Sequence, residues 1–200
     1  MKKQKNYHYL LFALLAIFVS SCNLSDIIDD DDLDDDDPES EIMSAKINGD
    51  AFMAVDSDKT LIQLDDVDAE LNLNGDVYEL NISGLDFGNS YLTTITISLR
   101  GDSYSSLKVG DEFLGITEES YSSGSPIGAV GIIAKASLGG TTEFGGTTLF
   151  KEEETINVKI TKLDKENELV SGTFSFIAKD EDDDNFEIRV TDGVFTDVEF

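Results

Sequence analysis

The fold is decided by residues 91–100, which read YLTTITISLR. Apolar and polar side chains alternate here, so that one face holds Tyr91, Ile95, Ile97 and Leu99 while the other holds Thr94, Thr96, Ser98 and Arg100. Successive side chains of a β-strand point to opposite faces of the sheet. A period of two therefore predicts a strand with one face in a core and one face in water.

The same period recurs in three further stretches, at residues 78–83, 156–161 and 186–191. Their apolar positions are Tyr78, Leu80, Ile82, Ile156, Val158, Ile160, Phe186, Ile188 and Val190. The sequence contains no strong helical period. We expect nine or ten strands, all within one domain of residues 42–200.

Turn signals separate the predicted strands. Asn48-Gly49 and Asn74-Gly75 each lie between two strand-like runs, and Asn-Gly favours a two-residue hairpin. Polar loops are expected at residues 164–167 and 180–185. The pattern predicts an all-β fold, an antiparallel two-sheet sandwich, with a closed antiparallel β-barrel as the alternative.

One region departs from this pattern, because residues 120–148 are rich in Gly, Ser and Thr. Residues 127–138 predict a buried strand, with Gly128 and Gly131 at bulges or close approaches. Gly139-Gly140 and Gly145-Gly146 bracket residues 141–144 and are typical of a flexible loop. Such loops often carry binding functions.

The N-terminus has the order of a secretory signal peptide. Three lysines precede an apolar run at residues 10–19, and Ser20-Ser21 lead to Cys22. The run is short for a permanent membrane helix, the alternative interpretation. Residues 19–22, VSSC, resemble the lipobox of bacterial lipoproteins, which implies cleavage after residue 21 and lipidation of Cys22 by diacylglycerol and palmitate-type chains. Cys22 is the single cysteine of the chain and cannot form an internal disulfide, so lipidation also explains its presence.

An acidic segment follows, since residues 26–41 read DIIDDDDLDDDDPESE. Like charges and few apolar residues predict a disordered tether over residues 22–41. Acidic residues soon after a lipidated cysteine also resemble a signal that, in one group of Gram-negative bacteria, exports lipoproteins to the outer face of the outer membrane. Calcium binding by the Asp run is a third interpretation.

Charge limits the partners. After removal of residues 1–21 the chain has 11 Lys and Arg against 42 Asp and Glu, a formal charge of −31, and residues 42–200 alone carry −20. Such a charge repels phosphate backbones, so we expect no nucleic-acid binding, and it favours a soluble monomeric domain.

Three short motifs resemble a known family. Residues 45–49 read AKING, residues 170–176 VSGTFSF and residues 190–195 VTDGVF. Together they resemble uncharacterised Gram-negative bacterial lipoproteins that hold a domain of unknown function, with S-G-T-F-x-F and T-(N/D)-G-x-F motifs near the C-terminus. The resemblance covers most of residues 42–200, implies a surface-associated all-β domain and carries over no catalytic residue.

The C-terminal motifs also have a structural interpretation. Gly172 is expected to make room for an aromatic ring, and Phe174 and Phe176 to enter the core. Asp192-Gly193 predicts a tight turn or bulge before a last strand at residues 194–200.

Most catalytic chemistry is excluded by composition. The single histidine, His8, is lost with the signal peptide, and the chain has no Trp. Serine and cysteine triads, histidine or cysteine zinc sites and histidine-ligated haem are therefore excluded. A glycosidase-type carboxylate pair remains open, but no pair is singled out. We expect no enzyme.

Two sets of residues are candidates for ligand binding. Calcium, the one cofactor considered, could be held by loop carboxylates, a set that comprises Asp56, Asp58, Asp65, Asp66, Asp68, Asp182 and Asp184. Tyr104 and Tyr121 are the candidate exposed platforms for a sugar. The sequence thus predicts a lipid-anchored, surface-exposed outer-membrane lipoprotein that binds a glycan or protein without catalysis. A periplasm-facing structural or assembly lipoprotein, or a calcium-binding β-domain, is the alternative.

Overall fold

The computed structural model describes residues 42–55, 66–88, 90–122, 126–137, 141–180 and 186–200. These residues fold almost entirely as antiparallel strands, and they hold eleven of them where the sequence suggested nine or ten. The strands are β1 (Ile42–Ile47), β2 (Asp50–Val55), β3 (Val67–Asn74), β4 (Val77–Phe87), β5 (Tyr91–Gly101), β6 (Glu112–Leu114), β7 (Gly128–Ser137), β8 (Thr142–Thr147), β9 (Ile156–Asp164), β10 (Leu169–Lys179) and β11 (Glu187–Glu199). Short helical turns are η1 (Tyr104–Ser106), α2 (Glu118–Ser122) and η2 (Glu153–Thr155).

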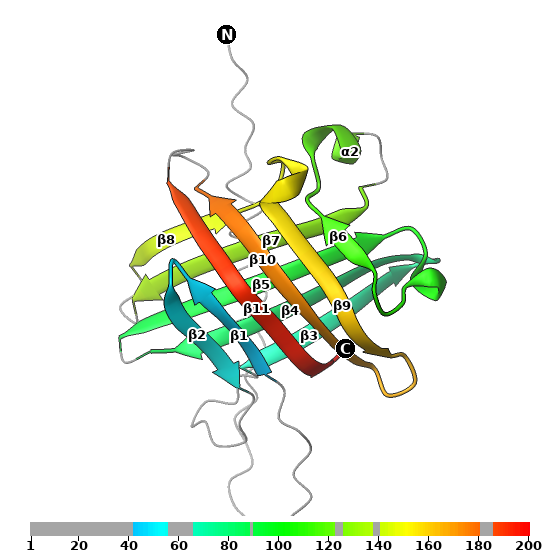
Figure 1. Cartoon of the computed structure of the whole chain (residues 1–200), viewed down its shortest axis with the longest axis horizontal. Helices are drawn as coiled ribbons and strands as arrows, with labels where there is room; N and C mark the ends of the chain where they lie inside the picture. Colours follow the sequence, from blue (N-terminus) through cyan, green and yellow to red (C-terminus); the bar gives the residue numbers. More distant parts are fainter. Residues whose placement is uncertain (1–41, 56–65, 89, 123–125, 138–140, 181–185) are drawn as a thin grey trace, which may run out of the picture. The chain divides into compact units, whose positions relative to one another are not determined.

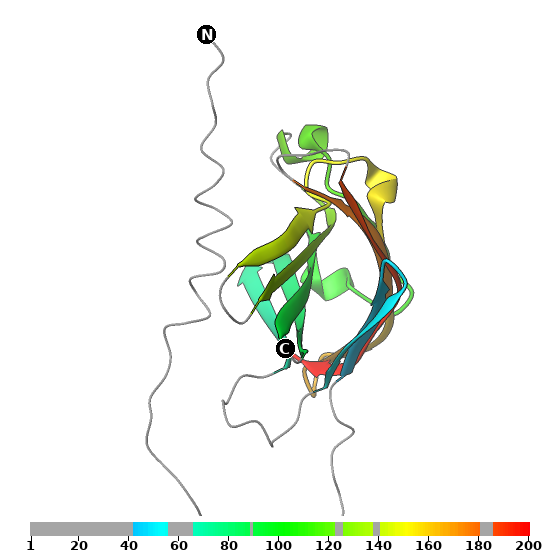
Figure 2. The ribbon, with the colours of Figure 1, turned by 90° about the vertical axis from the view of Figure 1, so that its left-hand side faces the viewer.

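The strands form two facing layers. One layer has the order β2-β1-β11-β10-β9-β6 and the other the order β8-β7-β5-β4-β3. A single register pair, Lys179 with Thr147, joins them through β10 and β8. The result is one curled, sandwich-like sheet whose layers cross in Figure 1 and face each other in Figure 2. The predicted all-β antiparallel fold is confirmed.

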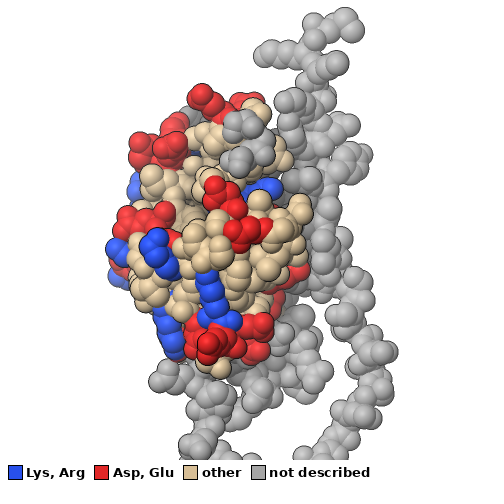
Figure 3. Space-filling view, turned by 90° about the vertical axis from the view of Figure 1, so that its right-hand side faces the viewer, with Lys and Arg blue, Asp and Glu red and all other residues tan. Residues whose placement is uncertain are grey.

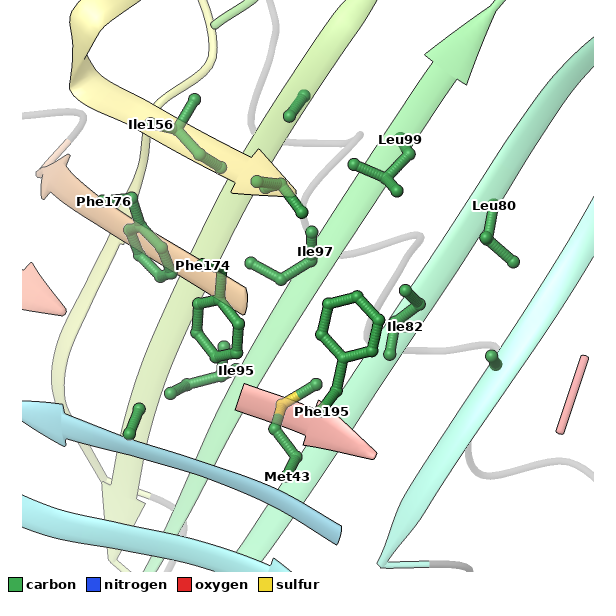
Figure 4. Packing of buried hydrophobic residues seen from close by; sticks show 14 of the residues in the cluster. Met43, Leu80, Ile82, Ile95, Ile97, Leu99, Ile156, Phe174, Phe176 and Phe195 are labelled. Carbon is green, nitrogen blue, oxygen red and sulfur yellow. The ribbon is translucent and has the colours of Figure 1, made fainter. Parts of the chain in front are cut away.

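The core lies between the two layers. Figure 4 shows Met43 and Phe195 packed near Ile82, Ile95 and Ile97. The predicted inward residues of β4, β5 and β9 are buried with one exception, and the buried set comprises Tyr78, Leu80, Ile82, Ile95, Ile97, Leu99, Ile156, Val158 and Ile160. The exception is Tyr91, the first residue of β5, which is 37 % exposed. The period-two reading of these three strands is therefore confirmed.

Glycine in the strands makes room for aromatic rings, as the sequence suggested at Gly172. A Cβ there would lie 2.4 Å from Phe195 Cζ, and one at Gly131 would lie 2.8 Å from Phe176 Cγ. Gly131 is on β7 and Phe176 on β10, so this contact bridges the layers. The rings of Phe174 and Phe195 stack with their centroids 6.3 Å apart.

The first hairpin is confirmed as expected, because Asn48 and Gly49 both have positive φ, at 51° and 96°. The second hairpin is confirmed, but its loop is shifted by one residue. Asn74 pairs with Val77, so the loop is Gly75-Asp76, and only Gly75 has positive φ. This arrangement is typical of a type II′ turn, in which glycine takes the first loop position.

The C-terminal strand was predicted to begin after Asp192-Gly193, and this prediction is wrong. β11 runs from Glu187 to Glu199, and Asp192 at φ 53° lies where the register with β10 shifts. The bulge interpretation therefore holds and the turn interpretation fails. Phe186, expected in the core, is 44 % exposed because it lies before the first residue of β11.

The predicted loop at residues 141–146 is also different in the structure. Gly145 and Gly146 belong to strand β8 and not to a loop. A Cβ at Gly146 would lie 3.1 Å from Ala178 Cβ and from Lys179 O, so glycine allows β8 to approach β10 closely. Gly139-Gly140 lie outside the described residues. The predicted strand around Gly128 and Gly131 is confirmed as β7.

The signal peptide, Cys22 and the acidic tether predicted at residues 1–41 lie outside the described residues. Within the part that the structure describes, no helix has the length and apolar character needed to cross a bilayer.

Candidate binding site

The short helix α2 presents Tyr121 at one end of the sandwich. Thr117 caps this helix, because its Oγ1 accepts a hydrogen bond from Ser120 N at 3.2 Å and its carbonyl accepts one from Tyr121 N at 3.0 Å. The capped turn fixes the backbone of Tyr121, whose side chain is 52 % exposed.

A tight turn at residues 148–151 presents a second aromatic ring. Lys151 N donates to Thr148 O at 3.2 Å, which closes the turn around Leu149 and Phe150. Phe150 has a φ of 61°, at the turn position where Gly or Asn is ordinarily found. A bulky residue with positive φ is a genuine outlier. Strain of this kind is common at ligand-binding positions.

The same short segment anchors both aromatic residues. Phe150 N donates to Ile116 O at 3.1 Å, directly before the capping residue Thr117. Thr148 is fully buried, and its Oγ1 accepts from Gly131 N at 2.9 Å. The rings of Tyr121 and Phe150 therefore meet edge to face, with centroids 5.1 Å apart and planes inclined at 74°.

An open pocket of about 520 Å³ lies beside this aromatic pair. Its lining residues come from the α2 segment, the Phe150 turn and the end of β10, and comprise Thr117, Glu118, Glu119, Phe150, Lys151, Glu152 and Lys179. We name this feature the aromatic pocket. Phe150 is the one apolar residue of this lining, and the pocket is a shallow depression that is open to solvent.

Charges of both signs line the aromatic pocket. Lys179 Nζ lies 3.9 Å from Glu152 Oε2 and 4.0 Å from Glu187 Oε1, and its side chain is mostly buried. The backbone of Glu152 is fixed as well, because its carbonyl accepts from both Thr155 N and Thr155 Oγ1. Figure 3 shows a flank of the domain on which acidic and basic side chains are likewise interleaved.

Tyr104, the other predicted sugar platform, lies at the opposite end of β9 from the aromatic pocket. Its ring packs edge-on against Tyr78, with centroids 6.0 Å apart, and Lys165 Nζ lies 4.6 Å from its centroid. Lys165 Nζ also donates to Tyr104 O at 2.7 Å. The structure gives Tyr104 a packing role and does not bring it together with Tyr121.

Among the calcium candidates, Asp56, Asp58, Asp65, Asp182 and Asp184 lie outside the described residues. Asp66 is nearly buried before β3, where its carbonyl accepts from Leu85 N, and Asp68 is exposed on β3. In the described ranges, no three His, Cys, Asp or Glu side chains gather in a way that could hold a metal ion. Calcium binding stays a prediction.

Two further polar clusters hold the fold together. Asp76 accepts from Ser103 Oγ at 2.7 Å and from Ser105 N at 3.0 Å, and these hydrogen bonds lower the pKa of the Asp76 carboxyl. Ser171 Oγ donates to Asp197 Oδ1 and accepts from Asp197 N, each at 2.9 Å. Asp197 has positive φ, so the second cluster fastens an irregular stretch of β11 to β10.

Comparisons with known proteins find no matching family model, no matching curated protein and no matching solved structure. The family resemblance of the three short motifs therefore stays a prediction.

Sequence reasoning found Tyr121 but missed its partner ring Phe150 and the aromatic pocket beside the pair. Phe150 is a single aromatic residue in a polar stretch, and no pattern links it to Tyr121 or Lys179. The signal lies in the backbone, since only the positive φ of Phe150 distinguishes it from an ordinary exposed side chain.

Proposed function

We propose that this chain is a lipid-anchored lipoprotein of the outer membrane, exposed at the cell surface, whose β-domain binds a ligand without catalysing a reaction. Cys22 carries the anchor and residues 22–41 separate the domain from the membrane. The aromatic pocket is the binding site.

The observation that supports this function is the exposed Tyr121–Phe150 pair. Tyr121 is 52 % and Phe150 37 % exposed although their rings are in contact, and Phe150 has a backbone conformation that costs about 1–2 kcal/mol for a residue with a Cβ. Neither feature contributes to the core, from which both rings are absent. A ligand that packs on the rings accounts for both.

Catalysis is not part of the proposal, because residues 23–200 contain no His or Cys and the sulfur of a lipidated Cys22 is a thioether. The polar groups of the aromatic pocket are carboxylates, ammonium groups and a threonine hydroxyl that already caps α2. These groups can orient a ligand by hydrogen bonds.

The test uses residues 22–200 with Cys22→Ser, which keeps the processed chain in solution. The protein is screened against an oligosaccharide array and against acidic and basic peptides. We expect at least one bound probe to lose roughly tenfold in affinity in Tyr121→Ala and Phe150→Ala, as the loss of about 1.4 kcal/mol of ring contact implies.

Phe87→Ala and Tyr91→Ala are the matched controls. Phe87 is 43 % exposed and Tyr91 37 %, close to the 37 % of Phe150. Tyr91 begins β5 and Phe87 ends β4 opposite Leu92, so both lie at the end of these strands that is far from the aromatic pocket. Control variants that weaken binding as much as the pocket variants would contradict the proposal, as would a screen in which no probe binds.

A further inference from the structure

We infer that two copies of this chain associate face to face through the outer side of the β8-β7-β5-β4-β3 layer, the side that points away from the core. This surface is separate from the aromatic pocket, so the association does not depend on the ligand of that pocket. The net charge of the domain favours a monomer, but the charges are unevenly distributed over its surface.

The outward side chains of β4, β5 and β7 lie in rows across the three strands. Ser83, Thr96 and Ile132 form the middle row, as the register of the strands requires. We name the uncharged rows the neutral face, which comprises Asn81, Ser83, Leu85, Leu92, Thr94, Thr96, Ser98, Val130, Ile132, Ala134 and Ala136. Because 28 % of the chain is charged, a surface of this size without a charged residue departs from the composition of the protein.

The outward face of the opposite layer is built differently. Its charged side chains pair across neighbouring strands, and the pairs are Lys46–Asp192 at 2.8 Å, Lys159–Glu112 at 2.8 Å and Lys162–Asp197 at 2.7 Å. A polar and charged outward face is typical of a sheet that has one side in water. The two outer faces of the same domain therefore differ in character, and the neutral face is the less suited to water.

Apolar side chains occupy part of the neutral face although none of them belongs to the core. Leu85, Leu92 and Ile132 are half-buried on the outer side of the sheet, and Val130 is 9 % exposed. Threonine, serine, alanine and asparagine fill the other positions, so the side chains are short. Two such surfaces can pack at about 10 Å, the ordinary spacing of stacked sheets.

The charges that border the neutral face are compatible with a second copy. At one end Glu79 lies opposite Arg100, one charge of each sign. Along β3, the acidic side is formed by Asp68 and Glu70, whereas β8 is uncharged at the outward position Thr147. Two copies related by a two-fold axis along the strands would place β3 of one copy near β8 of the other, so that the carboxylates of β3 do not meet.

Charge and area both favour a second copy as the occupant. Residues 42–200 carry a formal charge of −20, so two copies repel each other wherever their acidic surfaces meet, and the neutral faces can meet without that repulsion. A basic partner would be attracted to the acidic surfaces instead. Five strands about 4.8 Å apart and roughly 30 Å long offer about 700 Å², close to the ~800 Å² that a stable interface buries on each partner.

The test is sedimentation equilibrium of residues 22–200 with Cys22→Ser, which excludes disulfide-linked dimers. We expect a concentration-dependent dimer that becomes tighter as the salt concentration is raised from about 0.05 M to about 0.5 M. Salt screens the repulsion between the acidic surfaces, and no ion pair holds the neutral faces together.

Variants at the centre of the neutral face identify the interface. Thr96→Glu and Thr96→Lys should each weaken self-association at least about tenfold, because like charges then face each other. An equimolar mixture of the two variants should associate again, because the charges that meet are then opposite. This recovery is expected of a second copy and of no other occupant.

Thr173→Glu and Thr173→Lys are the matched controls. Thr173 is exposed on the outward face of β10, in the opposite layer, between Val194 and Lys159. Both control variants should keep the dissociation constant of the parent within about twofold. Melting temperatures confirm that each variant is folded.

Three outcomes would overturn the inference. A parent chain that is still a monomer at millimolar concentration and high salt would show that the neutral face has another occupant, such as a lipid surface or a different protein. A dimer that both Thr96 variants leave intact would place the contact elsewhere. Folded Thr96 variants that lose the dimer and do not recover it in the mixture would show that the two neutral faces do not meet.

Discussion

Individual glycines decide how closely the strands of this domain approach their neighbours. Gly172 lies beneath Phe195 and beside the backbone of β9, where a Cβ would be 2.6 Å from Lys159 O. A backbone atom cannot move aside as a flexible side chain can. The glycine of the S-G-T-F motif is therefore required by packing, whatever the function of the protein.

Gly172→Ala should lower the free energy of unfolding by about 1–3 kcal/mol, the usual cost of overpacking a core. Gly145→Ala is the control, because its new methyl group would meet no atom closer than Ile133 O at 3.9 Å. Urea denaturation measures both. Equal stability of the two variants would show that β9 and Phe195 can shift at little cost.

Tyr78 links stability to alkaline pH. Burial, followed by the charges of Asp111 and Asp102, raises the pKa of Tyr78 to about 12. The unfolded chain ionises this phenol near pH 10, so the unfolded state releases the proton first and folding stability falls as pH rises from 10 to 12. The slope from this group is at most about 1.4 kcal/mol per pH unit.

Tyr78→Phe should remove that part of the pH dependence. Denaturation of the parent and the variant between pH 9 and pH 12 isolates it, since all other groups contribute equally to both. Below pH 10 the free energies of unfolding of the two proteins should change with pH in parallel. Above pH 10 the free energy of unfolding of the parent should fall more steeply than that of Tyr78→Phe. Parallel curves through the whole range would contradict a raised pKa for Tyr78.

At the scale of elements, the turn at residues 148–151 carries the strain of the proposed site. Phe150→Gly and Phe150→Ala both remove the ring, but only alanine keeps a Cβ at φ 61°. We expect the glycine variant to be more stable than the alanine variant by about 1 kcal/mol. Thermal denaturation measures the difference, and a more stable alanine variant would show that the turn relaxes.

Whether the sequence predicts an element correctly depends on whether local residues or a distant partner strand determine that element. The period-two strands β4, β5 and β9 were predicted correctly because local alternation fixes which face is buried. β8 was missed because Gly145 and Gly146 resemble a loop until β10 is known to approach them. Asp192 was ambiguous for the same reason, since a bulge is defined by the partner strand.

The aromatic pocket was missed for the same reason, because segments that are distant in the sequence form it. Tyr121 could be proposed from its polar surroundings, but its companions come from a turn before β9 and from the end of β10. Their meeting depends on hydrogen bonds such as that from Phe150 N to Ile116 O. These long-range contacts have no local sequence signature.

At the scale of the whole molecule, the net charge of the domain is compatible with the proposed membrane anchor. A formal charge of −20 on residues 42–200 repels anionic surfaces. Several acyl chains on Cys22 would hold the protein on a membrane stably, because each buried CH₂ contributes about 0.8 kcal/mol. A binding domain on such an anchor is useful only on the side of the membrane where its ligand is found.

Protease treatment of intact cells, with lysed cells as the control and with detection of residues 42–200, tests the central claim most directly. The proposal predicts that the domain is cleaved in intact cells, and that Cys22→Ser abolishes metabolic labelling with palmitate and releases the chain from the membrane fraction. Protection of the domain until the cells are lysed would contradict surface display and place its partners in the periplasm.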